Sequence, residues 1–149
     1  MNIFSKNLTG CFITDTELSF IEVKGSAENT ELVSKITIPL PENSIVNGKI
    51  NEVGELVKTI EKKLKKHDHE FSQEVVVVLP EKIILSDIFA IPTSSGELEK
   101  ELFHQIKKRF PVNLDDHIID FDDFSEDEKN VYVSVSVVKK DIQARYQKL

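Results

Sequence analysis

The chain has little of several things that would each point to a function. Its 149 residues include one cysteine, Cys11, so it can form neither an internal disulfide nor a cysteine-based zinc site. A lone cysteine is typical of a reducing compartment, and we expect Cys11 to be a small buried apolar residue. No apolar run approaches the roughly 20 residues of a membrane-spanning helix, and the first residues lack the apolar segment of a signal peptide.

Positive charge is also scarce. The formal net charge of −7 argues against nucleic acid as a partner, because nucleic-acid binding needs a basic face. It leaves a basic peptide or protein partner open. The 40% hydrophobic and 30% charged residues are typical of a soluble globular protein, with one large domain or two small subdomains sharing a core.

Catalytic motifs are missing. No GxSxG, Walker A or GxGxxG pattern occurs in the sequence. His67 and His69 have the spacing of two metal ligands on a strand, but they follow a lysine-rich segment and no third ligand is in view. His104 and His117 are expected to be surface or half-buried residues. We therefore expect no enzyme activity, no cofactor and no bound metal.

Residues 74–92, EVVVVLPEKIILSDIFAIP, are the stretch around which the chain is organised. The apolar and mostly β-branched residues 75–79 predict a strand buried on both faces, and residues 83–90 predict a second strand. A helix to Phe110 should follow, with Thr93, Ser94 or Ser95 as its N-cap. We interpret this stretch as the boundary between two subdomains.

The segments before this stretch predict an antiparallel meander and a helix. Residues 10–15, 18–24 and 32–38 are expected strands, separated by polar turns. A helix should run from an N-cap at Asn51 to about Lys66. Its apolar stripe, which should face a sheet, consists of Val53, Leu56, Val57, Ile60 and Leu64.

The lysines near the end of this helix allow two readings. They are Lys62, Lys63, Lys65 and Lys66. A solvated helix end is favoured, because the helix dipole stabilises cations there. Contact with anionic lipid is the alternative.

The segments after the central stretch predict two strands and a last helix. Residues 117–124 and 131–138 are the expected strands, and the second alternates apolar and other side chains most regularly. A helix should begin at Lys139, and its apolar stripe stops abruptly at Leu149. We interpret the chain as a fragment of a longer protein.

An acidic run lies in this part of the chain. Eight carboxylates fall within fourteen residues that contain no Lys or Arg: Asp115, Asp116, Asp120, Asp122, Asp123, Glu126, Asp127 and Glu128. A solvated loop and strand edge would explain the run. A docking surface for a basic segment is the alternative, because patches of one charge steer partners of the other.

Four motifs in this order resemble the N-terminal half of the PilM family, the actin-like proteins of type IV pilus assembly that are related to FtsA. They are LPENSIVNGKI (residues 40–50), VVVVLPEKII (75–84), IPTSSGELEKEL (91–102) and KRFPVNLDDHIIDF (108–121). The resemblance implies a mixed α/β fold. Residues 1–81 and 139–149 would form part of actin-like subdomain 1A, and residues 82–138 an inserted strand-helix-strand-strand subdomain 1C.

The resemblance also implies a partner. In PilM the cytoplasmic tail of the membrane protein PilN docks between 1A and 1C, and the cytoplasmic domain of the type II secretion protein GspL is a similar module. We therefore expect a basic PilN-like tail as partner, with a cytoplasmic location that is peripheral to the inner membrane and no direct membrane insertion. Self-association is allowed. The expected contact residues are Leu85, Phe89, Phe110, Pro111, Asp115, Asp116 and Asp120.

One departure bears on activity. Nucleotide-binding relatives begin with a phosphate motif similar to GIDIGSSSIK, whereas this chain has GCFITDTE at residues 10–17. Phe12 stands where the acidic residue belongs, Thr14 replaces the second glycine, and Asp15 is displaced. A scaffold is therefore favoured. A fragment of an actin-like ATPase, or an FtsA-like cell-division adaptor, is the alternative.

Overall fold

The computed structural model describes residues 7–26, 28–72 and 74–149 and divides the chain into two compact units. The first unit consists of Met1–Pro80 and Ala144–Leu149, and the second of Glu81–Gln143. Both combine strands with helices, so the expected mixed α/β fold is confirmed.

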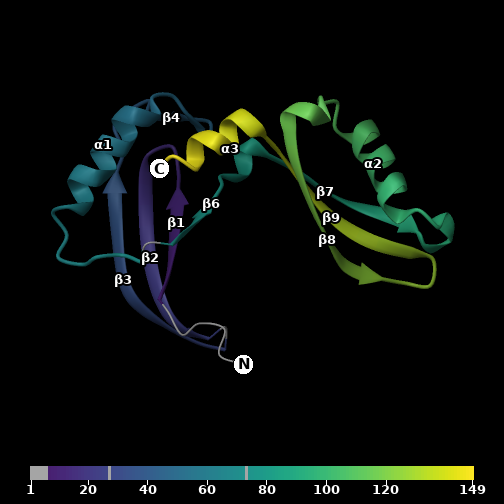
Figure 1. The fold of residues 1–149 in the computed structure, drawn as a ribbon, viewed down its shortest axis with the longest axis horizontal. Coiled ribbons are helices and arrows are strands. Elements are labelled where there is room, and N and C mark those ends of the chain that lie inside the picture. Colours follow the sequence, from purple (N-terminus) through teal and green to yellow (C-terminus); the bar gives the residue numbers. More distant parts are fainter. Residues whose placement is uncertain (1–6, 27, 73) are drawn as a thin grey trace. The chain divides into compact units, whose positions relative to one another are not determined.

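The first unit is built on a four-stranded sheet with the order β3-β2-β1-β6 (Figure 1). Its strands are β1 (Leu8–Ile13), β2 (Glu17–Ser26), β3 (Asn29–Pro39) and β6 (Val75–Val78). The first three strands form the predicted antiparallel meander, and β6 adds to β1 in parallel. A short hairpin of β4 (Ile45–Val46) and β5 (Lys49–Ile50) precedes α1 (Val53–Leu64). The helix α3 (Lys140–Tyr146) begins in the second unit and ends in the first.

The helix α1 packs its apolar stripe into the core of this unit. Leu56 and Ile60 are each 2% exposed, while Val53, Val57 and Leu64 are half-buried at the margins. The buried apolar side chains of the strands, among them Cys11, Leu18 and Ile38, lie on one face of the sheet because side chains alternate along each strand. The predicted stripe is therefore confirmed.

The valine strand differs from its prediction. Val76 and Val78 of β6 are 54% and 49% exposed, so the expectation of burial on both faces is wrong. The physical reason is the face on which they lie: Val76 and Val78 are the register partners of Gly10 and Phe12, on the side of the sheet opposite the buried Cys11, and Phe12 is itself 50% exposed. A run of β-branched residues favours a strand, but it does not determine whether both faces of the strand are covered.

Both predicted N-caps are wrong. The residue before α1 is Glu52, and the Asn51 side chain instead donates a hydrogen bond to the Asn43 carbonyl oxygen at 2.6 Å. The residue before α2 (Leu98–Arg109) is Glu97, because Thr93–Ser95 form a separate 3₁₀ turn, η2. Gly96 ends that turn with a φ of 65°, a left-handed conformation that glycine adopts without steric cost.

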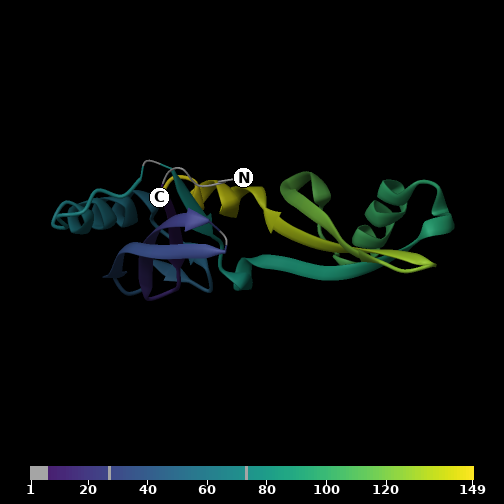
Figure 2. The same cartoon turned by 90° about the horizontal axis from the view of Figure 1, so that it is seen from below.

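The second unit is a three-stranded antiparallel sheet with the order β7-β9-β8. Its elements are η1 (Glu81–Ile83), β7 (Ile84–Pro92), η2, α2, η3 (Leu114–Asp116), β8 (His117–Glu126) and β9 (Asn130–Lys139). The helix α2 lies on one side of these strands (Figure 2). Val133, Val135 and Val137 of β9 are fully buried on that side, so the predicted alternation of this strand is confirmed.

Candidate partner-binding site

All seven residues expected to contact a partner lie in the second unit. Leu85 and Phe89 belong to β7, Phe110 and Pro111 follow α2, and Asp115, Asp116 and Asp120 lie in η3 and β8. Leu85 and Phe89 share the α2-facing side of β7, opposite Val137 and Val133 of β9. Asp120 is paired with Ser136 and lies on the other face of the sheet.

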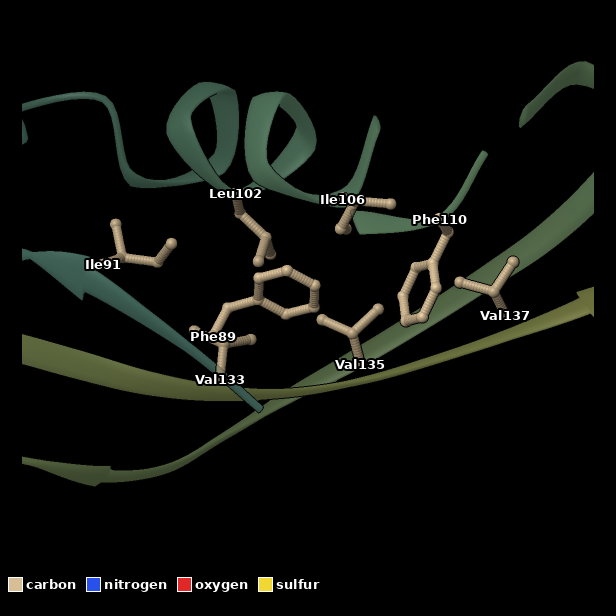
Figure 3. Close-up of a cluster of buried hydrophobic side chains, with 8 residues drawn as sticks. All are labelled: Phe89, Ile91, Leu102, Ile106, Phe110, Val133, Val135 and Val137. Atoms are coloured by element: carbon tan, nitrogen blue, oxygen red, sulfur yellow. The ribbon is translucent and has the colours of Figure 1, made fainter. Parts of the chain in front are cut away.

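The two phenylalanines are part of the core of the second unit. Phe89 and Phe110 are 6% and 8% exposed, and their rings meet edge to face with centroids 6.0 Å apart (Figure 3). Leu102, Ile106 and the β9 valines complete the cluster. Aromatic pairs of this geometry contribute about 0.5–1.5 kcal/mol beyond their area burial. The two phenylalanine side chains are therefore buried beneath the surface and offer a partner little area to contact.

Two of the apolar residues expected to contact a partner are exposed. Leu85 is 42% exposed, although its backbone faces Val137 in the register of β7 and β9. Pro111 directly follows the buried Phe110 and is exposed. A partner could therefore touch these two side chains.

The three aspartates are exposed and lie in ordered backbone. Asn113 stabilises the η3 turn, since its Oδ1 accepts from the Asp115 amide at 3.1 Å and its Nδ2 donates to Asp116 Oδ2 at 3.3 Å. The Lys140 ammonium donates to the Asp115 carbonyl oxygen at 2.7 Å. Asp120 Oδ1 accepts from the amide of Phe121 at 3.1 Å. The carboxylates of Asp116 and Asp120 are therefore held at the surface, while Asp115 is held through its backbone.

An ion pair that the sequence did not indicate lies next to Leu85. Asp87 lies on the same side of β7 as Leu85 and Phe89, and its Oδ2 accepts a hydrogen bond from Arg109 Nε at the end of α2. This bond, followed by the bond from the Ile88 amide, holds the pKa of Asp87 below its usual value. No local pattern could have revealed the pair, because its members are 22 positions apart on different elements.

The first hairpin uses Asp15 to hold a turn. The Asp15 carboxylate accepts from the amides of Asn47 and Gly48 at 3.1 and 2.9 Å. Both residues have positive φ angles, which direct their amides to one side. The Tyr146 hydroxyl donates to the Gly48 carbonyl oxygen at 2.6 Å, and burial together with Asp15 raises the pKa of Tyr146 to about 12. Asp15 therefore fixes the β4–β5 turn, while Phe12 is 50% exposed.

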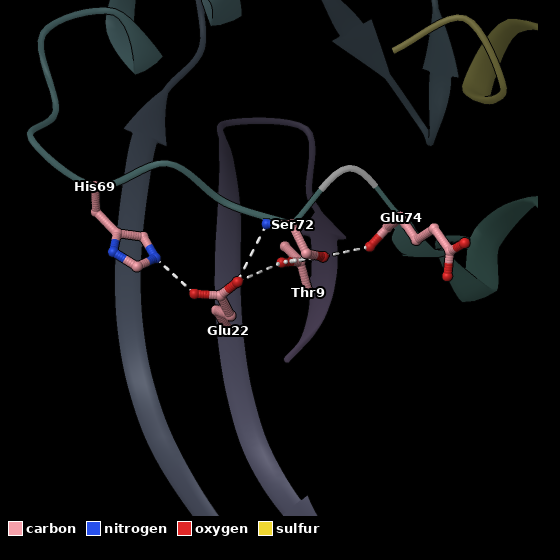
Figure 4. A network of polar contacts seen from close by, with 5 residues as sticks. All are labelled: Thr9, Glu22, His69, Ser72 and Glu74. Atoms are coloured by element: carbon pink, nitrogen blue, oxygen red, sulfur yellow. Dashed lines mark hydrogen bonds and ion pairs between the residues drawn. The ribbon is translucent and has the colours of Figure 1, made fainter. Parts of the chain in front are cut away.

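A buried carboxyl group forms a second polar network in the first unit. Glu22 is 2% exposed, and it contacts His69, the Ser72 amide and the Thr9 hydroxyl (Figure 4). His69 has the spacing of a metal ligand with His67 in the sequence, and the structure directs it to Glu22. In the part of the chain that the structure describes, no group of three or more metal-ligating side chains is placed to hold an ion.

Comparisons with solved structures reveal the fold. A chain of a PilM–PilN type IV pilus biogenesis complex superimposes with a TM-score of 0.74 at 19% identity, over 95% of this chain and 43% of that one. The cytoplasmic domain of EpsL, an inner-membrane component of the type II secretion system of Vibrio cholerae, gives a TM-score of 0.57 at 14% identity, over 96% and 52%. The chain thus spans about half the length of these proteins.

Within the described residues, no helix is long and apolar enough to cross a bilayer.

Two further comparisons concern the sequence of the chain. No curated protein sequence matches it. The sequence model of the type IV pilus assembly protein PilM matches residues 10–148, which is nearly the whole chain. The chain therefore belongs to the PilM family of type IV pilus assembly proteins.

Proposed function

We propose that this chain is a non-enzymatic scaffold of a type IV pilus or related secretion platform, and that it binds the cytoplasmic tail of a PilN-like inner-membrane protein. The observation that carries the proposal is the family match over residues 10–148. The similarity to a PilM chain in a complex with PilN supports the choice of partner. Binding to that tail would keep the chain on the cytoplasmic side of the inner membrane.

We assign the two units to the subdomains of the family. The first unit corresponds to part of the actin-like subdomain 1A and the second to the inserted subdomain 1C. The structural division, at Pro80 and Ala144, supports this assignment. It differs by a few residues from the boundaries expected from the sequence, because the start of α3 stays with the second unit.

The proposed contact surface lies on the second unit. Leu85 and Pro111 are its exposed apolar residues, and Phe89 and Phe110 form the packed layer beneath them. Asp115 and Asp116 supply negative charge for a basic segment, and Asp120 adds to it from the other face of the sheet. Apolar anchors carry most of the affinity in such surfaces, whereas charges at the rim act chiefly on association rate and salt dependence.

The first hairpin supports a scaffold over an ATPase fragment. Asp15, the acidic residue closest to the expected phosphate motif, holds the β4–β5 turn through two backbone amides. A carboxylate used in this way is poorly placed to help hold a nucleotide-bound metal ion. No observation favours an FtsA-like adaptor.

Fluorescence anisotropy tests the proposal. The probe is a labelled peptide with the N-terminal cytoplasmic sequence of the PilN-like protein from the same organism, and a peptide of the same composition in scrambled order is the control. We expect saturable binding of the native order only. Raising the salt from about 0.05 to 0.5 M shortens the Debye length from roughly 14 to 4 Å, so binding should weaken without being lost. Equal binding of the two peptides would contradict the proposal.

A further inference from the structure

The two edges of the β7-β9-β8 sheet differ in how well they are protected. Along β8 the exposed acidic side chains are Asp120, Asp122, Asp123 and Glu126, and its register with β9 shifts between Asp123 and Ser125. Charged side chains and bulges are the features by which proteins block an edge strand against pairing. The β8 edge therefore carries both kinds of protection.

The β7 edge has fewer charged side chains than the β8 edge, and its register with β9 shows no bulge. Its nine residues keep a regular register with β9, and they include no Lys or Arg and one acidic residue, Asp87. The Asp87 side chain lies on the α2 side, where Arg109 binds it. Among the described strands, β7 pairs with β9 alone. The sheet thus has one protected edge and one open edge.

One hydrogen bond identifies the backbone groups that point out of the β7 edge. The Ile88 amide donates to Asp87 Oδ1 at 2.9 Å, so this amide is directed away from β9. Successive residues of a strand direct their backbone groups to alternate sides, so Ile84, Ser86 and Ala90 also face outward. The Ala90 carbonyl oxygen is approached by Gln105 Nε2 at 3.5 Å, which leaves residues 84–88 as the open part of the edge.

Exposed apolar side chains flank this open part on both faces of the sheet. Leu85 is 42% exposed on the α2 side, and Ile88 is 57% exposed on the opposite side. A neighbouring strand would place its own side chains beside both, since cross-strand pairs lie about 4.5–5.5 Å apart between Cβ atoms. An added strand would therefore bury apolar surface as well as form backbone hydrogen bonds.

We propose that β7 binds an extended segment of the partner as a fourth strand of this sheet. This inference rests on the proposed function and specifies how the PilN-like tail would bind. The segment would carry apolar side chains against Leu85 and Ile88, and the net charge of −7 of the whole chain favours basic residues elsewhere in it. Backbone hydrogen bonds give affinity in strand addition, and alternate side chains give specificity.

The Asp87 carboxylate occupies the place that a backbone carbonyl oxygen of the added strand would take. It accepts from the outward Ile88 amide, where a carbonyl oxygen of an added strand would bind. Arg109 holds Asp87 from the other side and would keep the carboxylate paired after its displacement. In the free protein, Asp87 therefore satisfies a donor that strand addition would use.

Amide hydrogen exchange and one matched pair of variants test this mode of binding. Ile88 of β7 and Leu32 of β3 are apolar strand residues of similar exposure, 57% and 59%, and Leu32 lies in the first unit, outside the proposed contact surface. Each is replaced by lysine, and thermal unfolding confirms that both variants fold. The probe is the labelled N-terminal peptide of the PilN-like protein.

Strand addition at β7 predicts slower exchange of the Ser86 and Ile88 amides on peptide binding, with no change along β3. Ile88→Lys should weaken binding by at least about tenfold, because a charge replaces a central apolar contact, and Leu32→Lys should leave binding within about twofold. Peptide binding without slower amide exchange along β7, or an equal loss of affinity in the two variants, would overturn strand addition at β7 and leave the proposed function standing. Failure of the wild-type chain to bind the peptide would overturn both.

Discussion

The Oε2 atom of Glu22 lies 2.5 Å from Nε2 of His69, although the two residues are 47 positions apart in the sequence. The contact joins β2 to the segment between α1 and β6. Glu22 Oε1 also accepts from the Ser72 amide at 3.1 Å. One buried carboxyl group therefore binds both His69 and Ser72 of this segment to β2.

His69→Ala should lower the free energy of unfolding by about 1–3 kcal/mol, because it leaves a buried acceptor without one of its partners. Urea denaturation measures the change. His67→Ala is the matched control, since His67 is exposed on the same segment and should have little effect. Equal losses in the two variants would mean that the contact with Glu22 does not stabilise the fold.

Leu56→Ala should cost roughly 2–5 kcal/mol, the usual range when a fully buried leucine is truncated. Leu56 is 2% exposed on the packed face of α1. Lys62→Ala, on the exposed face of the same helix, should leave the unfolding midpoint nearly unchanged. Thermal unfolding followed by circular dichroism compares the two, and a similar midpoint in both would contradict the packing of α1.

Phe110→Ala should mainly lower stability, whereas Leu85→Ala should mainly weaken peptide binding. Phe110 is a core residue, so its truncation should cost about 3–5 kcal/mol of stability. Leu85 is 42% exposed, so its truncation should preserve stability but weaken binding of the PilN-like peptide by at least about 1 kcal/mol. Denaturation and anisotropy on both variants give the comparison. Unchanged binding in a stable Leu85→Ala variant would place the contact surface elsewhere.

Cys11 should be unreactive in the folded chain. Burial raises the pKa of its thiol from 9.0 to about 12, so the reactive thiolate is rarer at pH 8 than for a free cysteine. DTNB should label Cys11 slowly until denaturant is added. Because the unfolded thiol ionises first, this group's contribution to stability is present below pH 9 and is lost as the pH rises towards 12. Rapid labelling of the native chain would contradict the burial of the Cys11 side chain on β1.

Magnesium ATP should give no saturable heat in a calorimetric titration of this chain. The reason is the altered phosphate motif, in which Phe12 is exposed and Asp15 binds the β4–β5 turn. Asp15→Ala should therefore affect the stability of the first unit and not nucleotide binding. A dissociation constant in the low micromolar range would refute the scaffold interpretation of the hairpin.

The sequence by itself determined the elements whose side-chain periodicity is strong. The alternation in β9 and the stripe of α1 predicted both the element and its buried face, because the geometry of a strand or a helix decides which side chains share a side. The order of four motifs indicated the family, which the match over residues 10–148 confirmed. These features are local, or depend only on order along the chain.

The tertiary structure decided what covers each face and which distant residues meet. Val76 and Val78 look like core residues in the sequence, yet they lie exposed at a sheet edge, while Phe110, expected as a surface anchor, is 8% exposed against Phe89. Glu22 is buried, and its partner His69 comes from a separate segment. Burial and pairing depend on contacts between segments far apart in the chain, and local periodicity carries no information about which segment supplies them.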